Sequence, residues 1–264
     1  MHPTENRHDP GRPYRVVGAI PARWGSTRLP GKALLELAGR PMVEHVWRRA
    51  RRATGLDRLV VLTDHERIAE VVAGFGGEFE MTPPECASGT DRIAWAARGW
   101  DCDGVINIQG DEPLIDPDGI GRIAAHLAAH PEDPIATLAT DADPGDRETA
   151  SAVKVVLDRR GYALYFSRAA IPYPRNEGGA RPLRHLGIYG YQRQALLELA
   201  ALEPTPLELA ESLEQLRALE NGLAIRVLTG AAPSWGVDTA EDAEAMTARL
   251  VARAAGSDDS GGKS

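Results

Sequence analysis

The sequence predicts an α/β protein with three layers, in which a mostly parallel, mixed central sheet is flanked by helices. Two observations support this fold class. Apolar runs typical of buried strands alternate with segments of helical apolar spacing over roughly the first 110 residues, and further apolar runs follow in a less regular order. The chain has 264 residues, of which 43% are hydrophobic, and this is enough to bury a substantial core.

The first half of the chain gives a regular alternation of elements. Residues 15–20 form an apolar run typical of a strand that is buried on both faces. Residues 42–53 carry Met42, Val46, Trp47 and Ala50 at helical spacing. The expected elements are strands over 15–20, 59–63 and 105–109, and helices over 42–53, 66–74 and 88–99.

The second half is more mixed. We expect one domain over residues 14–255, with disordered tails at 1–13 and 256–264, because both ends are polar and rich in proline or glycine. A middle region is expected to build one wall of the site. The expected elements are strands over 134–140, 151–157, 162–166, 187–191 and 224–229, and helices over 193–202, 206–220 and 240–254.

Composition excludes several classes of function. A formal net charge of -8 argues against nonspecific binding of nucleic acid, which needs a basic surface. No run approaches about 18 apolar residues, so no membrane span is expected. With only Cys86 and Cys102 and no secretory apolar stretch at the start, a reducing cytoplasm is the expected location.

A basic, glycine-containing segment follows the first strand. Residues 21–32 read PARWGSTRLPGK, which suits a polyphosphate because cations neutralise the anion and glycines let backbone N–H groups approach it. The segment lacks the P-loop and dinucleotide-binding patterns, and a plain basic connecting loop is the alternative. The candidate ligands are the cations Arg23, Arg28 and Lys32, the hydroxyls Ser26 and Thr27, and Gly25 and Gly31.

Two carboxylates are candidate magnesium ligands. Asp111 follows the third strand in QGDEP, and Asp238 precedes the last helix in GVDTAED. Mg²⁺ takes oxygen ligands and keeps waters and substrate phosphates in its shell, so two such groups facing a triphosphate would suit it. The alternatives are a turn residue before Pro113 for Asp111 and a helix N-cap for Asp238.

Other candidates lie at the ends of strands and helices. Gln109 and Asp111 should face the same crevice as the basic loop, because ligands of such sheets bind beyond the carboxyl ends of the strands. Ser88, Gly89 and Arg92 lie at the start of a helix, where free N–H groups are available, although an ordinary capped helix is the alternative.

A third group of residues could bind a polyhydroxylated acid. Arg168 has the planar fork that holds a carboxylate at two points. Glu211 and Gln215 are four residues apart on the helix expected over 206–220, so they should share a face. His185 and Tyr189 lie in RHLGIYGY. Roles in the core or on the solvated surface are the alternatives for His185, Tyr189 and Glu211.

Taken together, these segments resemble the 3-deoxy-manno-octulosonate cytidylyltransferases (CMP-Kdo synthetases), a family with a nucleotidyltransferase fold. The matching stretches run in order from Ile20 to Asp242, so the resemblance covers nearly the whole globular region. They are IPARWGSTRLPGK, VLTDHE, SGTDR, NIQGDEP, KVVLDRRGYALYFSRAAIP, RHLGIYGY, LEQLR and GVDTAED.

The resemblance implies a role for each candidate. Arg23, Arg28 and Lys32 would hold the phosphates of CTP, Ser88, Arg92 and Gln109 the cytidine or its phosphates, and Asp111 and Asp238 Mg²⁺. The sugar-acid pocket would comprise Arg168, His185, Tyr189, Glu211 and Gln215. A homodimer is also implied. The chain departs from many relatives at residues 150–152 and has a shorter stretch over 174–183, both beside the implied acceptor pocket.

The implied reaction is attack by the anomeric hydroxyl of the acceptor on the α-phosphorus of CTP, with release of pyrophosphate. No dedicated general base and no covalent enzyme intermediate are expected. Two alternatives stay open at this point. One is CMP transfer to another acid, such as 8-amino-octulosonate or a small phosphonate, for example phosphonoformate. The other is a noncatalytic module that binds CTP.

Overall fold

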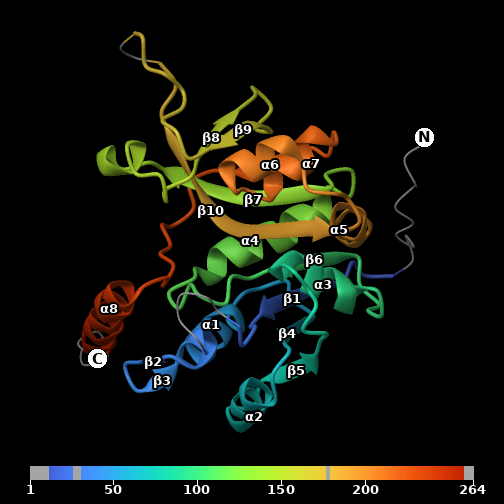
Figure 1. Ribbon diagram of the computed structural model, residues 1–264, viewed down its shortest axis with the longest axis vertical. Coiled ribbons are helices and arrows are strands. Elements are labelled where there is room, and N and C mark those ends of the chain that lie inside the picture. The colour runs from blue at the N-terminus through green and yellow to red at the C-terminus, as the bar shows by residue number, and fades with distance from the viewer. Residues whose placement is uncertain (1–11, 26–30, 177–178, 259–264) are drawn as a thin grey trace, which may run out of the picture.

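A computed structural model of the protein describes residues 12–25, 31–176 and 179–258. Nine strands of these residues form one mixed sheet (Figure 1), and seven of them follow the order β11-β7-β10-β6-β1-β4-β5. The long strand β10 pairs antiparallel with β6 and with β7, whereas the pairs β6-β1, β1-β4, β4-β5 and β7-β11 are parallel. The predicted α/β class with a mostly parallel, mixed sheet is therefore confirmed.

The strands come from both halves of the chain. The sheet strands are β1 (Val16–Pro21), β4 (Arg58–Thr63), β5 (Glu78–Met81), β6 (Gly104–Asn107), β7 (Ile135–Asp141), β8 (Lys154–Leu157), β9 (Ala163–Ser167), β10 (Leu183–Gln192) and β11 (Ile225–Leu228). The hairpin β8-β9 extends the sheet through the start of β10. A separate pair joins β2 (Glu36–Leu37) to β3 (Arg40–Pro41).

Helices cover both faces of the sheet and make the three layers. The helices are α1 (Met42–Ala50), α2 (Glu66–Gly74), α3 (Gly89–Ala97), α4 (Pro117–Ala129), α5 (Arg193–Ala200), α6 (Pro206–Glu211), α7 (Gln215–Glu220) and α8 (Ala240–Asp258), with short 3-10 turns at Lys32–Leu34 and Pro144–Arg147. None of these described helices could cross a membrane.

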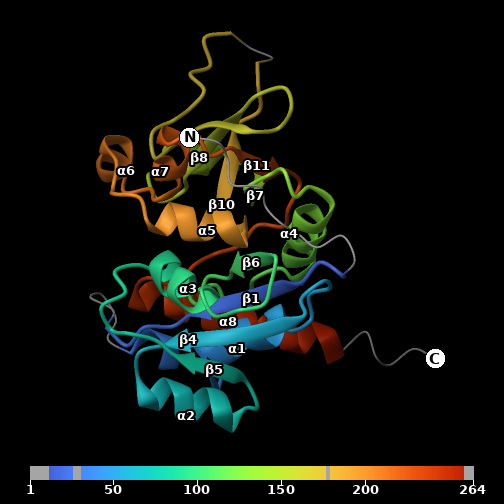
Figure 2. The ribbon, with the colours of Figure 1, turned by 90° about the vertical axis from the view of Figure 1, so that its right-hand side faces the viewer.

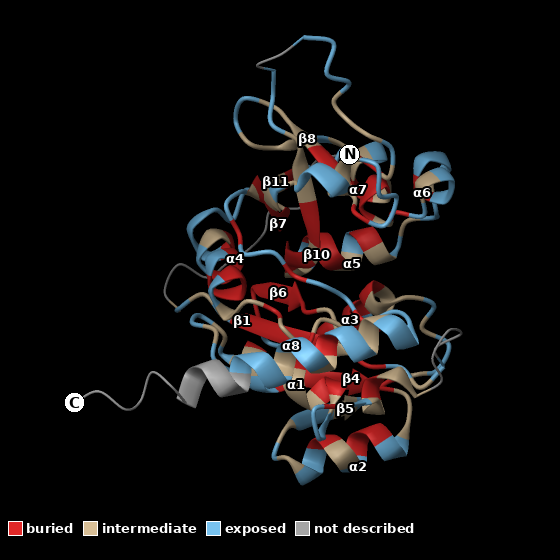
Figure 3. Cartoon of the chain, turned by 90° about the vertical axis from the view of Figure 1, so that its left-hand side faces the viewer, coloured by how far each residue is buried: buried red, intermediate tan, exposed pale blue. Residues whose placement is uncertain are grey.

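Strand β1 shows how the sequence produces the layers. Successive side chains of a strand point to opposite faces, so an apolar run fills two cores at once. Val16 and Ile20 join the cluster under α1, α2 and α4, while Val17 and Ala19 join the cluster under α3, α5 and α7. Figure 3 shows the buried strands between helices whose outer faces are exposed.

The chain after β11 crosses back over the molecule and places α8 beside α1 and β2 (Figure 1). Val237 and Met246 are buried there against Leu37 and Met42. This crossing joins the end of the chain to the segment that follows the basic loop. It is the reason why Asp238, which lies 206 residues after Lys32, reaches the same place.

The structure corrects some expected elements. The predicted helix over 206–220 is wrong, because Ser212 adopts a left-handed conformation (φ 51°) that separates α6 from α7. Helix α1 ends at Ala50 rather than at residue 53. Helix α4, strand β5 and the β2-β3 pair were not expected, although Asp116 before Pro117 is a typical helix start.

Both predicted tails lie mostly outside the described residues. At the N-terminal end, however, Arg12 donates a hydrogen bond to Asp103 over 2.8 Å. At the C-terminal end, α8 continues to Asp258 and so includes residues that the sequence assigns to the tail.

Candidate active site

The ends of β1 and β6 approach each other closely and form the floor of a cavity. A Cβ atom built on Gly110 would lie 2.7 Å from the backbone oxygen of Pro21, so only glycine fits here. The cavity has a volume of about 480 Å³. Its lining comes from the end of β1, the 3-10 turn at Lys32–Leu34, the starts of α1 and α3, the loop after β6 and the segment before α8. The lining residues are Pro21, Ala22, Arg23, Lys32, Ala33, Met42, Ala87, Ser88, Gly89, Arg92, Gln109, Gly110, Asp111 and Asp238.

Lys32 draws together the two carboxylates that the sequence singles out. Its ammonium group donates to Asp111 over 2.7 Å and to Asp238 over 2.8 Å. Burial lowers the pKa of Lys32, but the two neighbouring carboxylates outweigh burial, and the net direction is upward. Lys32 therefore stays charged. The predicted meeting of Asp111, Asp238 and the basic segment at one crevice agrees with this arrangement.

The alternative roles of the two carboxylates can be assessed directly. Helix α8 is preceded by a reciprocal cap between Thr239 and Asp242: Asp242 N donates to the Thr239 hydroxyl over 3.1 Å, and Thr239 N donates to the Asp242 carboxylate over 2.9 Å. Asp238 is therefore not needed as the N-cap. Its side chain keeps 56% of its surface exposed and that of Asp111 keeps 34%, so both remain accessible from the cavity.

The segment that carries Asp238 is fastened to the loop that carries Asp111. Val237 N donates to the backbone oxygen of Asp111 over 2.9 Å, and the Ser234 hydroxyl donates to Glu112 over 2.6 Å. Burial raises the pKa of Glu112 to about 7, against the opposing effect of the Ser234 hydrogen bond. These contacts fix the spacing of the two carboxylates.

The start of α3 forms another wall of the larger cavity. Ser88 is the N-cap, and its hydroxyl accepts from Asp91 N while Ser88 N donates to the Asp91 carboxylate, each over 3.0 Å. Arg92 touches the cavity, but only 2% of its side chain is exposed, and its guanidinium donates to Asp64 over 2.9 Å. The ordinary cap is thus present at Ser88, and the charge of Arg92 is already paired.

Of the remaining predicted phosphate ligands, Arg23, Gly25 and Gly31 lie among the described residues and the others do not. Arg23 is exposed at the edge of the cavity. Gly25 is also exposed, and a Cβ built there would meet nothing within 4 Å. Ser26, Thr27 and Arg28 lie outside the described residues. Gly31 has a positive φ of 67°, a conformation that suits glycine.

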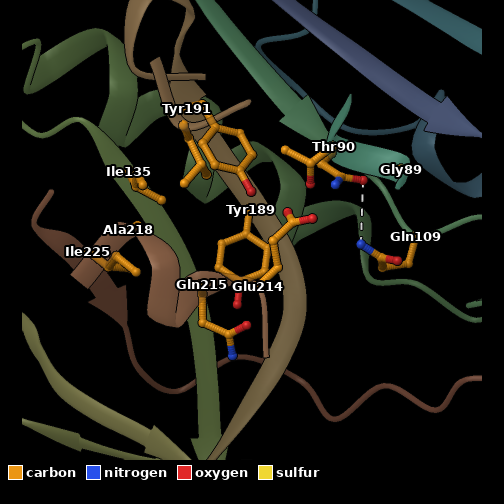
Figure 4. A pocket seen from close by; sticks show the side chains of 12 residues that line it. Gly89, Thr90, Gln109, Ile135, Tyr189, Tyr191, Glu214, Gln215, Ala218 and Ile225 are labelled. Carbon is orange, nitrogen blue, oxygen red and sulfur yellow. Dashed lines mark hydrogen bonds between the residues drawn. The ribbon is translucent and has the colours of Figure 1, made fainter. Parts of the chain in front are cut away.

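A second, smaller cavity of about 220 Å³ adjoins the first and shares Gly89 and Gln109 with it. Figure 4 shows its polar side chains, which converge from the start of α3, the sheet and the region of α7. The lining residues are Gly89, Thr90, Asn107, Gln109, Ile135, Tyr189, Tyr191, Leu199, Glu214, Gln215, Ala218 and Ile225.

Tyr189 presents a hydroxyl without a partner to this second cavity. The residue is 9% exposed, and its hydroxyl oxygen is buried with no hydrogen bond (Figure 4). Burial raises the pKa of Tyr189 well above its ordinary value, so the group is a neutral donor. A buried hydroxyl normally has a partner, and a ligand with polar oxygens would supply one here.

Gln215 and Glu214 reach the same cavity from the start of α7. Burial raises the pKa of Glu214, and hydrogen bonds with Thr90 and Ser88 oppose that rise. Glu214, Thr90 and Asn107 were not among the predicted residues. Glu214 stands beside Gln215 in LEQLR, but the expectation of one continuous helix favoured Glu211, which is four residues before Gln215.

Glu211 and Arg168 lie together outside the lining of both cavities. The Glu211 carboxylate accepts from the Ser167 hydroxyl over 2.6 Å and from Arg168 N over 2.9 Å. The Arg168 guanidinium donates to the backbone oxygens of Glu211, Ala150 and Ser212 over 2.7 to 3.2 Å. The expectation that Glu211 and Gln215 share a helix face is wrong, and the acceptor-binding roles of Glu211 and Arg168 stay predictions.

His185 packs behind Tyr189 rather than lining the cavity. The two rings lie 5.2 Å apart, and His185 Nε2 shares a hydrogen bond of 3.1 Å with the Thr137 hydroxyl. Burial lowers the pKa of His185 to about 3, so the ring is neutral at physiological pH. In this structure His185 supports the wall that carries Tyr189.

The chemistry of the larger cavity fits a divalent cation. Two carboxylates already enclose one positive charge, the Lys32 ammonium, within hydrogen-bonding distance. Among the described residues no three His, Cys, Asp or Glu side chains gather as a complete metal site. Oxygen ligands beyond Asp111 and Asp238 would have to come from a bound phosphate and water, as is usual for Mg²⁺.

The mixed α/β fold and the cation-edged cavity at the ends of β1 and β6 are features of enzymes that act on nucleotides. Residues 17–225 match a protein-family model described as cytidylyltransferase. The chain is also 49% identical to the 3-deoxy-manno-octulosonate cytidylyltransferase of Syntrophobacter fumaroxidans, over 92% of this chain and 99% of the relative. It therefore belongs to the 3-deoxy-manno-octulosonate cytidylyltransferase family.

Further comparisons agree with this family. A mitochondrial 3-deoxy-manno-octulosonate cytidylyltransferase of Arabidopsis thaliana is 42% identical over 90% of this chain and 84% of its own length. A solved structure of CMP:2-keto-3-deoxy-manno-octonic acid synthetase complexed with CTP matches with a TM-score of 0.87 and 42% identity, covering 90% of this chain and 99% of that one. A 4-diphosphocytidyl-2C-methyl-D-erythritol synthase from Anaerococcus prevotii shares the fold at a TM-score of 0.60 and 14% identity.

Proposed function

We propose that this protein transfers CMP from CTP to 3-deoxy-manno-octulosonate and releases pyrophosphate. The observation that carries this proposal is the pair of adjoining cavities that share Gly89 and Gln109. One has a cationic edge suited to a triphosphate, and the other is a smaller polar and aromatic pocket suited to a sugar acid. The family relatives and the neighbour that binds CTP support the same reaction.

The larger cavity would bind the nucleotide. Arg23 at its edge and the basic loop would neutralise the phosphates, while Lys32 balances the charge of Asp111 and Asp238. The N-terminus of α3, where Ser88 and Gly89 line the cavity, presents backbone N–H groups. Charge neutralisation and positioning of this kind stabilise the pyrophosphate that leaves.

The smaller cavity would orient the acceptor. The Tyr189 hydroxyl, Gln215 and Glu214 offer hydrogen bonds to a polyhydroxylated molecule, and Gln109 stands at the boundary between the two cavities. An acceptor held there would present its anomeric hydroxyl toward the α-phosphorus of CTP. The rate then comes from holding the two substrates together, without an enzyme-bound intermediate.

Asp111 and Asp238 would hold Mg²⁺ together with phosphate oxygens and water. When bound, the ion would stabilise charge on the α-phosphate and lower the pKa of the attacking hydroxyl. The Lys32 ammonium group supplies the charge that balances Asp111 and Asp238. Lys32 lies between both carboxylates and must move aside or share them when the ion binds.

A screen of pyrophosphate release tests the proposal. The purified chain is mixed with Mg²⁺ and either CTP, UTP or ATP, and with one of three acceptors: 3-deoxy-manno-octulosonate, its 8-amino analogue or phosphonoformate. We expect release with CTP and the unmodified octulosonate, at a kcat/KM at least tenfold above every other pair. Faster turnover with either other acid would contradict the proposed acceptor. Binding of CTP without release for any acid would indicate a noncatalytic module.

We further propose a cytoplasmic homodimer. Cys86 and Cys102 are free thiols, which suits a reducing compartment. Exposed apolar side chains occur on the hairpin β8-β9 and on α6, including Leu164 at 63% and Leu209 at 68% exposure, and they would suit contact with a second copy. Light scattering after gel filtration tests this, with a mass of twice 28.4 kDa expected and a monomer mass contradicting it.

A further inference from the structure

The segment TDH at the end of β4 has no part in either cavity lining, yet it touches the root of the basic loop. Residues Thr63, Asp64 and His65 lie where β4 runs into α2, beside the end of β1 (Figure 2). The loop leaves β1 at the same edge of the sheet.

Asp64 connects the two walls of the larger cavity. One carboxylate oxygen accepts from the backbone N–H of Trp24 over 2.9 Å, and the other accepts from the guanidinium of Arg92 over 2.9 Å. Trp24 follows Arg23 on the loop side, and Arg92 is in the first turn of α3 on the other side. A single carboxylate thus ties the basic loop to the helix whose N-terminus faces it.

Further hydrogen bonds hold the Arg92 side chain beside Asp64. Its guanidinium also donates to the hydroxyl of Thr82 and, over 3.4 Å, to the backbone oxygen of Pro83. The Thr82 hydroxyl in turn donates to the backbone oxygen of Thr63 over 3.0 Å. If Arg92 turned toward a ligand, the ion pair with Asp64 and the hydrogen bonds with Thr82 and Pro83 would be lost, which is costly for a buried guanidinium.

His65 supports the side chain of Trp24. The two rings stack with centroids 4.0 Å apart and an angle of 15° between their planes. The guanidinium carbon of Arg67 lies 5.8 Å from the centre of the same indole ring. His65 is also the N-cap of α2, because its Nδ1 accepts from Arg67 N over 3.2 Å. One ring therefore has two separate contacts, a stack and a cap.

Trp24 in turn closes the neck of the loop. Gly31 N donates to the backbone oxygen of Trp24 over 3.2 Å, so the backbone at Trp24 is joined to the backbone at Gly31. A Cβ built on Gly31 would lie 3.5 Å from the indole ring. Fixing Trp24 therefore fixes both ends of the segment, with Arg23 on one side and Lys32 on the other.

We propose that Asp64 and His65 are positioning residues for the nucleotide: they hold Trp24 at the neck of the basic loop, and thereby set where Arg23 and Lys32 stand against the phosphates of CTP. This inference rests on the proposed function, because it takes a nucleoside triphosphate as the ligand of the larger cavity. Neither Asp64 nor His65 lines the larger cavity.

Two substitutions of His65 separate the stack from the cap. His65→Asn removes the ring but keeps an acceptor that serves well as an N-cap, whereas His65→Phe keeps a flat ring against Trp24 and removes the acceptor. Asp64→Asn is a harsher change, because it leaves the buried Arg92 guanidinium without a carboxylate. The His65 pair therefore carries the test.

The experiment measures CTP binding by titration calorimetry in magnesium chloride without acceptor, together with the Tm of each protein. For His65→Asn we expect a Kd for CTP about three- to tenfold higher with nearly unchanged Tm. For His65→Phe we expect a Kd within about twofold of the unaltered protein and a Tm lower by about 2–4 °C. A purely structural role would lower affinity only in step with Tm.

Two results would overturn the inference while leaving the proposed function intact. One is a His65→Asn variant that binds CTP as tightly as the unaltered protein. The other is a His65→Phe variant that loses as much affinity as His65→Asn. Failure of the unaltered protein to bind CTP would instead refute the proposed function, and this inference with it.

Discussion

Removing the Tyr189 hydroxyl should have opposite effects on stability and on acceptor binding. In this structure the oxygen is buried without a hydrogen bond, which costs folding free energy. Tyr189→Phe removes the polar atom and keeps the ring that packs against His185. We expect the free energy of unfolding to rise by about 1 kcal/mol, the lower end of the cost of a buried unsatisfied group. For a chain of this size that corresponds to a Tm higher by about 2–4 °C.

The same variant should bind the acceptor less well. A hydrogen bond to a neutral group contributes about 0.5–1.5 kcal/mol, so loss of the one that Tyr189 would donate should raise the acceptor KM about three- to tenfold. The KM for CTP should stay the same, because Tyr189 does not line the larger cavity. Steady-state kinetics with each substrate varied in turn measures both values.

Tyr191 provides a matched control. It lines the same cavity and is 3% exposed, but its hydroxyl has a hydrogen bond with Thr90. Tyr191→Phe removes a bond that exists, so its Tm should fall by about 2–4 °C. A fall in Tm for Tyr189→Phe as well, or an unchanged acceptor KM in that variant, would refute the role given to the unpartnered hydroxyl.

Three further predictions concern the remaining groups. Asp111→Asn should reduce kcat by at least about 100-fold with an unchanged circular dichroism spectrum. Asp118→Asn, on the exposed start of α4, is the control and should leave kcat unchanged. Near-normal turnover of Asp111→Asn would refute its metal role. Glu214→Gln should raise the acceptor KM more than Glu211→Gln does, because only Glu214 lines the smaller cavity. The reverse order would favour Glu211 as the acceptor-binding residue, as the sequence predicts. Burial lowers the pKa of His185 to about 3, so below about pH 6.5 the unfolded protein binds a proton at this residue that the folded protein does not, and stability is lost as pH falls. Between pH 7 and 5.5 the free energy of unfolding of the unaltered protein should fall by about 1 kcal/mol more than that of His185→Gln. Equal losses for the two proteins in urea titrations would contradict this.

The sequence predicted the fold well where apolar periodicity is strong. Strand β1 is apolar on both faces, and this pattern alone indicates a central strand between two helical layers. The position of Asp111 could also be predicted, because the ends of parallel strands meet at one edge of a sheet. Asp238 reaches the same edge only because the chain crosses the molecule before α8, and no local sequence pattern predicts that crossing.

The lining of the smaller cavity was harder to predict for a local reason. Ser212 takes a left-handed conformation that serine seldom adopts, so the sequence gives no signal for the break between α6 and α7. The break turns Glu211 toward Ser167 and leaves Glu214 facing the cavity. Arg92 shows a second limit, since a basic residue near a phosphate site can serve to hold the site together rather than to bind the ligand.

The proposed reaction is a direct transfer of CMP between substrates bound in the two adjoining cavities. The stereochemical course at the α-phosphorus tests it, using CTP with sulfur in place of one α-phosphate oxygen in a single known configuration. One in-line displacement by the acceptor hydroxyl predicts inversion of configuration in the CMP-linked product. Retention would mean two successive displacements through a covalent enzyme intermediate, and would contradict a direct transfer.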